Sequence, residues 1–341
     1  MSQSPPGTVL LTGASGFVGS AVLQQLLITG YRVHALERRP GSIPAAEGVS
    51  VYAGDVTDPA SLLRAAQGCQ FAIHCAADYR LSLRPGEVSQ MISVNVGGTA
   101  NVLQAAAAAG IRRLVHCSTV GTLAFERSGK VCVEADTSSS PALLAGPYKR
   151  SKWAAERLAL EHTHSGLGVV VVQPSTPVGK GDRRPTPTGQ TISDFLRGRI
   201  PAVVDTGLNL VSVDAVARGH VLALERGLPG RSYILGDQNL TLRQLLARVA
   251  HLAGTDPPRW RVPLSLAFAT ALTSEGVARF VGRAPAISLT SVRMAAHPMY
   301  VDSQRAQSEL GWETGELDLA LRQAVEELRP KSGRRLLARP S

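Results

Sequence analysis

Strands and helices alternate along the first half of the chain, and this alternation restricts the fold more than any other feature. Short apolar runs such as TVLLTG at residues 8–13 and RRLVHCST at 112–119 are separated by helical stretches such as DPASLLRAAQG at 58–68. Strands that are apolar throughout are typical of a parallel sheet with helices on both faces. The sequence therefore predicts an α/β fold of the Rossmann type, with a doubly wound parallel sheet.

A glycine-rich turn joins the first strand to the first helix in TVLLTGASGFVGSAV, residues 8–22. Glycines there allow a tight turn and a close approach of the backbone to a pyrophosphate, at a helix N-terminus whose dipole attracts anions. A strand before the glycines and a helix after them is the context in which this pattern binds a dinucleotide. The predicted cofactor contacts are Gly13, Ser15, Gly16, Phe17 and Val18.

The second strand ends in ALERRPG, residues 35–41, with two conflicting signals about the cofactor. Glu37 occupies the position where an acidic residue holds the ribose hydroxyls of NAD, whereas Arg38 would attract the 2′-phosphate of NADP. We therefore expect NADP or NAD and favour NADP. Later strand ends would border the same cofactor, and the contacts predicted there are Asp55, Val56, Ala76, Ala77, Asn95, Ser118, Pro174 and Thr176.

The regular alternation ends near residue 178, and this change divides the chain. Residues 1–178 are expected to form the dinucleotide-binding domain, and a segment at about 209–226 is expected to rejoin it as a strand and a helix. Residues 179–341 would form mainly a smaller substrate-binding lobe and a basic C-terminal tail. The apolar stretch 261–282 is expected to be core of the lobe or to line a pocket for a lipid-like substrate.

Several motifs follow one another in an order that resembles the extended short-chain dehydrogenase/reductase family. They are TGxxGxxG, a DxxD stretch, an HxAA strand end, NxxGT, a Ser/Thr strand end and YxxxK, and together they cover nearly the whole chain. That family uses a Ser/Thr–Tyr–Lys group. The resemblance implies that Tyr148 is the catalytic acid/base, that Lys152 is its partner and also binds the nicotinamide ribose, and that Thr119 holds the substrate oxygen. Tyr148 would border the cofactor as well.

The chemistry of a phenol explains why a lysine would stand one helical turn from Tyr148. Residues four apart lie on one face of a helix. A phenol has an ordinary pKa of about 10, which is too high for a base at neutral pH. A neighbouring ammonium favours the phenolate, so Lys152 is expected to lower the pKa of Tyr148.

The middle of the chain resembles a narrower group within that family. YKRSKWAAE, VVQPSTPVGKGDRRPTPTG and YILGDQNLTL are similar to the hopanoid-associated sugar epimerases, which lie near the dihydroflavonol reductase branch. The resemblance implies a sugar epimerase linked to hopanoid lipid metabolism. Its small-molecule substrate would be a sugar or a lipid-linked compound. A homodimer that includes the YxxxK helix is also implied.

Two departures favour an alternative reading. Sugar-nucleotide epimerases usually have an arginine where this chain has Leu208, and Ala215 follows Asp214 in place of a second acid. These changes favour an NADPH-dependent carbonyl reductase on a lipid-like or sugar-derived substrate. Arg183 and Arg184 could supply phosphate contacts or lie in a solvated loop. A non-catalytic NAD(P)-binding scaffold is disfavoured because both members of the Tyr–Lys pair are present.

Composition excludes several other classes of protein. The net charge is +10, but aromatic residues are only 4% and no zinc-finger or helix-turn-helix spacing occurs, so we expect no nucleic-acid partner. The N-terminal residues lack the pattern of a signal peptide, and no apolar run is long enough to cross a membrane. We expect a cytoplasmic protein whose basic tail, KSGRRLLARPS, could make weak contact with an anionic membrane surface.

The four cysteines are predicted to be free thiols. They are Cys69, Cys75, Cys117 and Cys132, and none has a CxxC partner or a histidine at the spacing of a metal ligand. The sequence therefore predicts no metal site.

Overall fold

The computed structural model describes residues 6–81, 83–84, 86–126, 128–281 and 289–330. The basic tail that was expected to touch a membrane surface lies outside the described residues. Among the helices that are described, none combines the length and the apolar composition needed to cross a membrane.

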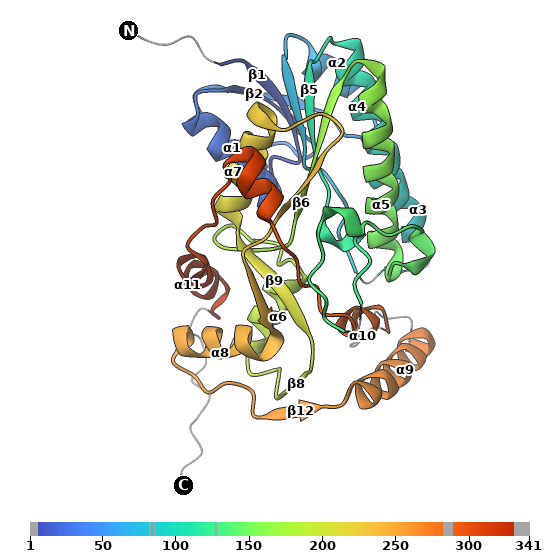
Figure 1. Cartoon of the computed structure of the whole chain (residues 1–341), viewed down its shortest axis with the longest axis vertical. Helices are drawn as coiled ribbons and strands as arrows, with labels where there is room; N and C mark the ends of the chain where they lie inside the picture. Colours follow the sequence, from blue (N-terminus) through green and yellow to red (C-terminus); the bar gives the residue numbers. More distant parts are fainter. Residues whose placement is uncertain (1–5, 82, 85, 127, 282–288, 331–341) are drawn as a thin grey trace.

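A seven-stranded parallel sheet forms the centre of the molecule, in the order β10-β6-β5-β4-β1-β2-β3 (Figure 1). The predicted doubly wound sheet is thereby confirmed. The order reverses between β1 and β4, so the carboxyl ends of these two strands flank the point where ligands bind in such sheets. The strands are β1 (Thr8–Thr12), β2 (Arg32–Glu37), β3 (Val49–Ala53), β4 (Phe71–His74), β5 (Arg113–Cys117), β6 (Gly168–Pro174) and β10 (Ser232–Leu235).

Helices cover both faces of this sheet and enclose two separate cores (Figure 1). On one face lie α1 (Phe17–Ile28) and α7 (Val213–Arg226), with the buried Trp312 beside them. The other face carries α2 (Pro59–Ala66), α4 (Gly98–Ala108) and α5 (Gly146–Glu161), with α3 (Glu87–Ile92) and the π-helical turn η1 (Ser93–Gly97) between them. The inner strands are thus buried on both sides, which explains why their sequences are largely apolar, whereas the edge strand β3 is mostly exposed.

The remaining elements form a smaller lobe beyond the carboxyl ends of the strands. Its core lies between a small sheet and three helices. On α9, the side chains of Leu266, Leu272 and Val277 are each more than half exposed. The elements are β7 (Thr176–Val178), α6 (Pro187–Leu196), β8 (Ala202–Val204), β9 (Gly207–Ser212), β11 (Gln238–Thr241), α8 (Leu242–Ala253), β12 (Trp260–Val262), α9 (Leu264–Val281), α10 (Leu289–Ala295) and α11 (Leu317–Leu328).

Residues 209–226 take part in both regions of the molecule. Their strand, β9, pairs with β7 and β11 in a three-stranded sheet and not with the central sheet. Their helix, α7, does return to the central sheet, where it packs against α1. The strand that completes the central sheet here is β10, which pairs with β6. The division of the chain at residue 178 stays a prediction.

Close contacts require glycine at two positions of the glycine-rich segment, one in the turn and one in α1. Gly13 has a φ of +79°, and a Cβ atom there would lie 2.6 Å from the backbone nitrogen of Ala76. A Cβ atom on Gly19 would lie 2.0 Å from the carbonyl oxygen of Gly13. These contacts hold α1 directly against β1 and the end of β4, so a side chain at either position would force the helix away from the sheet.

We expect Gly19→Ala to lower the free energy of unfolding by about 2–3 kcal/mol, as overpacking of a well-packed core does. Gly97→Ala is the matched control, since Gly97 has helical angles and nothing within 4 Å of its added Cβ. The control should be neutral or stabilising by up to about 1 kcal/mol. Urea unfolding without cofactor measures both, and equal effects would contradict the packing argument.

Candidate active site

The glycine turn lies at the carboxyl end of β1, beside the end of β4. The nitrogen of Gly16 donates to the carbonyl of Gly13 at 2.9 Å, and Gly16 caps α1 without a side-chain hydrogen bond. Ser15 and Gly16 are exposed, and Phe17 and Val18 are half-buried. The first-turn N–H groups of α1 therefore lie at an exposed helix N-terminus, next to a backbone that no Cβ atom obstructs. This arrangement fits the pyrophosphate of a dinucleotide.

Glu37 ends β2 and is buried, with its carboxylate holding the following loop. Its Oε1 atom accepts hydrogen bonds from the nitrogen of Ile43 at 2.8 Å and from the hydroxyl of Ser42 at 3.1 Å. The bond from Ile43 is the main cause that lowers the pKa of Glu37. The side chain therefore stays ionised and fixes the loop, and its contact with a ribose stays a prediction.

Arg38 and Asp55 lie beside each other at the same edge of the sheet. Their side chains are 3.9 Å apart, and that of Arg38 is 61% exposed. Asp55 is anchored through its Oδ1 atom, which accepts from the nitrogen and the hydroxyl of Thr57 at 2.8 and 2.7 Å. Val56 is buried, and its carbonyl accepts from Asn101. Arg38 is thus the exposed charge of this group, and it lies beside an anchored carboxylate.

Asn95 is buried on the π-helical turn η1, and its side chain makes three hydrogen bonds to other parts of the chain. Its amide nitrogen donates to the carbonyl of Asp78 and to the hydroxyl of Ser151, both at 2.9 Å. Its Oδ1 atom accepts from the nitrogen of Asp78 at 2.7 Å. Asn95 therefore joins the segment after β4 to helix α5, one residue before Lys152. Such π-helical turns are frequent at functional sites.

Tyr148 and Thr119 lie together where α5 meets the end of β5. A hydrogen bond with Thr119 favours the phenolate of Tyr148, but burial raises the pKa of the phenol and the neighbouring Cys117 raises it further. Thr119 also caps the next helical turn, since its Oγ1 atom accepts from the nitrogen of Gly121 at 3.1 Å. The two side chains that were predicted to meet the substrate oxygen are therefore brought together.

Lys152 does not act on Tyr148 as the spacing predicted. Its Nζ atom donates to the carbonyl of Cys117 at 2.7 Å, and the side chain is 3% exposed. Burial lowers the pKa of Lys152, while Cys117 and Glu156 oppose that change. The expectation of a lowered Tyr148 pKa is thus reversed in this structure, because burial outweighs a lysine that is bonded elsewhere. The bond uses one of the three N–H donors of the ammonium.

The other predicted cofactor residues lie along the same edge of the sheet. Ala76 and Ala77 follow β4 and are half-buried, and the nitrogen of Ala76 lies 3.4 Å from the hydroxyl of Thr12. Pro174 ends β6 and is buried, and Thr176 begins β7. Cofactor contact by any of these residues stays a prediction.

Comparison with known proteins identifies the family. The model of the NAD dependent epimerase/dehydratase family matches residues 9–236. The chain belongs to this family. It is an extended short-chain dehydrogenase/reductase, and so an enzyme of the oxidoreductase/epimerase type, as the motif order predicted.

Two relatives and one solved structure are similar over almost the whole chain. A Synechocystis protein named "Putative dihydroflavonol 4-reductase" is 39% identical over 92% of this chain and 92% of its own. Sterol demethylase protein B of Methylococcus capsulatus is 32% identical over 89% of this chain and 93% of its own. The crystal structure of gox2253 is 39% identical, with a TM-score of 0.82 over 94% of this chain and 97% of its own.

Glu156 is a site residue that sequence reasoning missed. It is 2% exposed and accepts hydrogen bonds from Ser118, from Thr122 at 3.1 Å and from Gln173 at 3.0 Å. Burial raises its pKa, and these bonds oppose the increase. Ser118, predicted to contact the cofactor, thus donates its hydroxyl to a buried carboxylate. The signal was present, because Glu156 follows Lys152 by four residues on the same helix face.

Lys149 is a second missed residue, and it faces the lobe instead of the sheet. Its Nζ atom lies 3.5 Å from the sulfur of Met299 and 5.8 Å from the centre of the Phe125 ring. The residue is 7% exposed, and none of the salt bridges among the described residues includes it. Burial lowers its pKa to about 8. Within the described part of the chain, the amine of Lys149 thus has a thioether and an aromatic ring as neighbours and no salt-bridge partner.

We expect Lys149→Met to raise the free energy of unfolding at neutral pH, by up to about 3 kcal/mol, because a buried charge no longer has to be formed. The pKa of Lys149 is depressed on folding, so wild-type stability should rise between pH 8 and 10.5, its ordinary value, and the difference should shrink there. Urea unfolding across this range measures it. Exposed Lys130→Met is the control, and parallel curves for all three proteins would contradict the burial argument.

Proposed function

We propose that this enzyme catalyses net hydride transfer between NADP(H) and a lipid-like alcohol or ketone, with the cofactor exchanged in each cycle. The names of the two relatives, a dihydroflavonol reductase and a sterol demethylase protein, support an apolar substrate. A reductase of an apolar substrate needs the acid/base pair and the cofactor site. It needs no arginine to bind a diphosphate, because its substrate carries none.

The surroundings of Leu208 carry this proposal. Leu208 stands where sugar-nucleotide epimerases usually have an arginine, and here it lies on β9 opposite Leu240 and bridges to Met299. Met299 in turn contacts Lys149, the neighbour of Tyr148. Leu208 packs against the apolar core of the lobe, and Met299 lies against helix α5, so neither position supplies a cation for a sugar diphosphate. An apolar residue at the position of the usual arginine favours an apolar substrate over a sugar diphosphate.

The proposed mechanism assigns each step to a residue of the chain. A bound nicotinamide would supply or accept the hydride. The N-terminus of α1 would bind the pyrophosphate, and the two remaining N–H donors of Lys152 would hold the ribose hydroxyls. Thr119 would hydrogen-bond the substrate oxygen and hold it against Tyr148. In reduction, Tyr148 would donate its phenolic proton to that oxygen, and in oxidation it would take the proton back.

A sugar epimerase linked to hopanoid lipid metabolism is the second candidate. The family to which the chain belongs includes epimerases by name, and Arg183 and Arg184 lie exposed after β7, where they could meet a phosphate. An epimerase would return the hydride to the same molecule and show no net use of cofactor. The predicted homodimer through α5 fits either candidate.

We expect purified enzyme with steroid-like or isoprenoid ketones to consume NADPH in a one-to-one ratio with alcohol formed. Tyr148→Phe should lower kcat by about 10²–10⁴-fold with NADPH binding retained, because it removes only the proton donor. Tyr52→Phe, on the edge strand β3, is the matched control. Cofactor absorbance and product analysis measure the ratio. Interconversion of sugar epimers without loss of NADPH would support the second candidate instead.

Arg38→Ala should weaken NADPH binding by about 10–100-fold and leave NADH binding nearly unchanged, because the guanidinium would contact only the 2′-phosphate. Arg32→Ala is the control, since Arg32 is exposed at the opposite end of the same strand. Quenching of intrinsic fluorescence by each cofactor gives the affinities. Equal weakening of both cofactors would remove the phosphate role from Arg38.

A further inference from the structure

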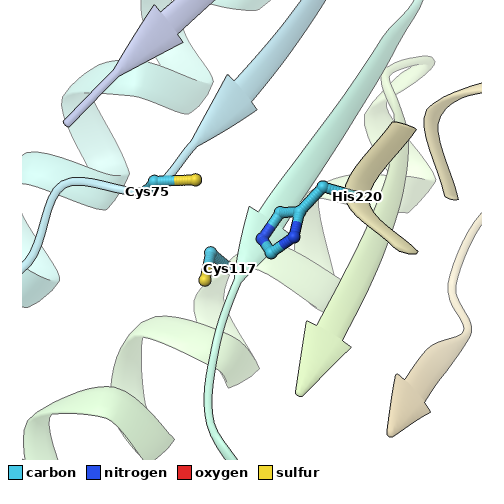
Figure 2. Close-up of side chains that lie close together, drawn as sticks. All are labelled: Cys75, Cys117 and His220. Atoms are coloured by element: carbon cyan, nitrogen blue, oxygen red, sulfur yellow. The ribbon is translucent and has the colours of Figure 1, made fainter. Parts of the chain in front are cut away.

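Two cysteines and a histidine that are far apart in the sequence meet behind the catalytic edge of the sheet. Cys75 follows β4, Cys117 ends β5 and His220 lies on α7, as Figure 2 shows. Their two sulfur atoms and one ring nitrogen all lie within 4.8 Å of one another. Because β4 and β5 are parallel with His74 opposite His116, the two cysteines occupy matching positions on neighbouring strands.

The orientation of His220 points to a missing ligand. The ring is fully buried, and its Nδ1 atom lies 2.8 Å from the carbonyl oxygen of Val216. A carbonyl only accepts, so Nδ1 carries the proton and Nε2 has a free lone pair. No described residue makes a hydrogen bond of ordinary geometry with Nε2, although the Cys117 thiol is close enough to interact with it. A buried acceptor without a partner is costly.

The same arrangement is the one found around metal-binding histidines. Such a histidine usually donates its other ring N–H to a carbonyl or carboxylate, which fixes the ring and directs the lone pair at the cation. Two cysteine thiolates and one imidazole are a ligand set for zinc, with a fourth position open to water. Harder ions that prefer oxygen ligands and octahedral geometry are poorly served by these donors.

The distances leave room for such an ion. A cation at the centre of an equilateral triangle with an edge of 4.8 Å would lie about 2.8 Å from each atom, which is the upper limit here. Zinc bonds are about 2.3 Å to sulfur and 2.0–2.1 Å to nitrogen, so the side chains would close by about half an ångström or slightly more. Rotation of two cysteine side chains at strand ends supplies that movement.

We propose that Cys75, Cys117 and His220 form a binding site for a thiophilic divalent cation of the zinc class. A bound ion would join the ends of β4 and β5 to α7. Cys117 is also the residue whose carbonyl accepts from Lys152, so occupancy would disturb the catalytic lysine and lower activity. Binding itself does not depend on the proposed function, because it is measured without substrate.

The test uses cobalt as a spectroscopic probe of the reduced, metal-free full chain. We expect one Co²⁺ per chain, with thiolate-to-cobalt charge-transfer absorption that Zn²⁺ removes by competition. Cys75→Ser and His220→Asn should each weaken binding by about 100-fold. Cys69→Ser is the matched control, because Cys69 also lies beside a histidine, with 3.3 Å between its sulfur and His34, but has no second thiol. The control should bind like wild type.

A second measurement protects the test against misfolded variants. In the unaltered protein, Zn²⁺ should slow alkylation of Cys75 and Cys117 and leave Cys69 and Cys132 unaffected, as mass spectrometry of the labelled peptides would show. Absence of charge-transfer absorption would overturn the proposal. Equal metal binding by the Cys75 and Cys69 variants would also overturn it. The same holds if mild oxidation joins Cys75 and Cys117 in a disulfide while the reduced protein binds no metal.

Discussion

The hydrogen-bonded junction between α5 and the ends of β5 and β6 is the constraint on which the active site depends. Lys152 donates to the carbonyl of Cys117, while Glu156 accepts from Ser118 and Gln173. These bonds join a helix to two strands by buried polar groups, each of which would be costly if left alone. They fix where α5 lies against the sheet, and Tyr148 is carried on the same helix face.

Burial governs the charges at this junction more than pairing does. Lys152 and Glu156 each shift the other toward its ionised form, yet burial lowers the pKa of Lys152 and raises that of Glu156. Both directions favour neutral groups, as expected when desolvation exceeds the attraction between partners. The raised pKa of Tyr148 has the same origin. A chemically competent phenolate therefore requires more than the lysine, and a cofactor ribose held by Lys152 is the group proposed to complete the site.

Much of the fold could be predicted because its signals are local. The apolar strands, the glycine turn and the helical stretch at 58–68 are each set by residues close together in the sequence. The structure has the turn, the sheet and that helix, which Asp58 caps. That Tyr148 and Lys152 share one helix face was predictable for the same reason, since four residues separate them, and their catalytic role stays a prediction. The direction of the Tyr148 pKa was not, because it depends on how deeply the helix is buried and on which group the lysine meets.

Contacts between segments far apart in the sequence could not be predicted from such local signals. Sequence spacing gave Cys75 and Cys117 no histidine partner, yet the fold places His220 beside both. Strand β9 reads like a continuation of the central sheet, but its partners are β7 and β11, which only the tertiary structure selects. Likewise, nothing near Lys149 in the sequence shows that Met299 lies next to it. Each of these missed features pairs segments that are far apart in the sequence, and neither segment alone carries a pattern that points to its partner.

Helix α5 presents one face to the central sheet and another to the lobe. Tyr148, Lys152 and Glu156 are spaced by four residues and share the face that meets the sheet, whereas Lys149 is turned by about 100° and meets Met299 of the lobe. The sheet face is restricted by buried hydrogen bonds, so a change there would disrupt the junction. On the lobe side, Lys149 contacts the thioether of Met299, and such packing contacts tolerate exchange more easily. Under the proposed function, substitution on the lobe side would alter the substrate while Tyr148 and Lys152 stay in place, which fits a family that contains both reductases and epimerases.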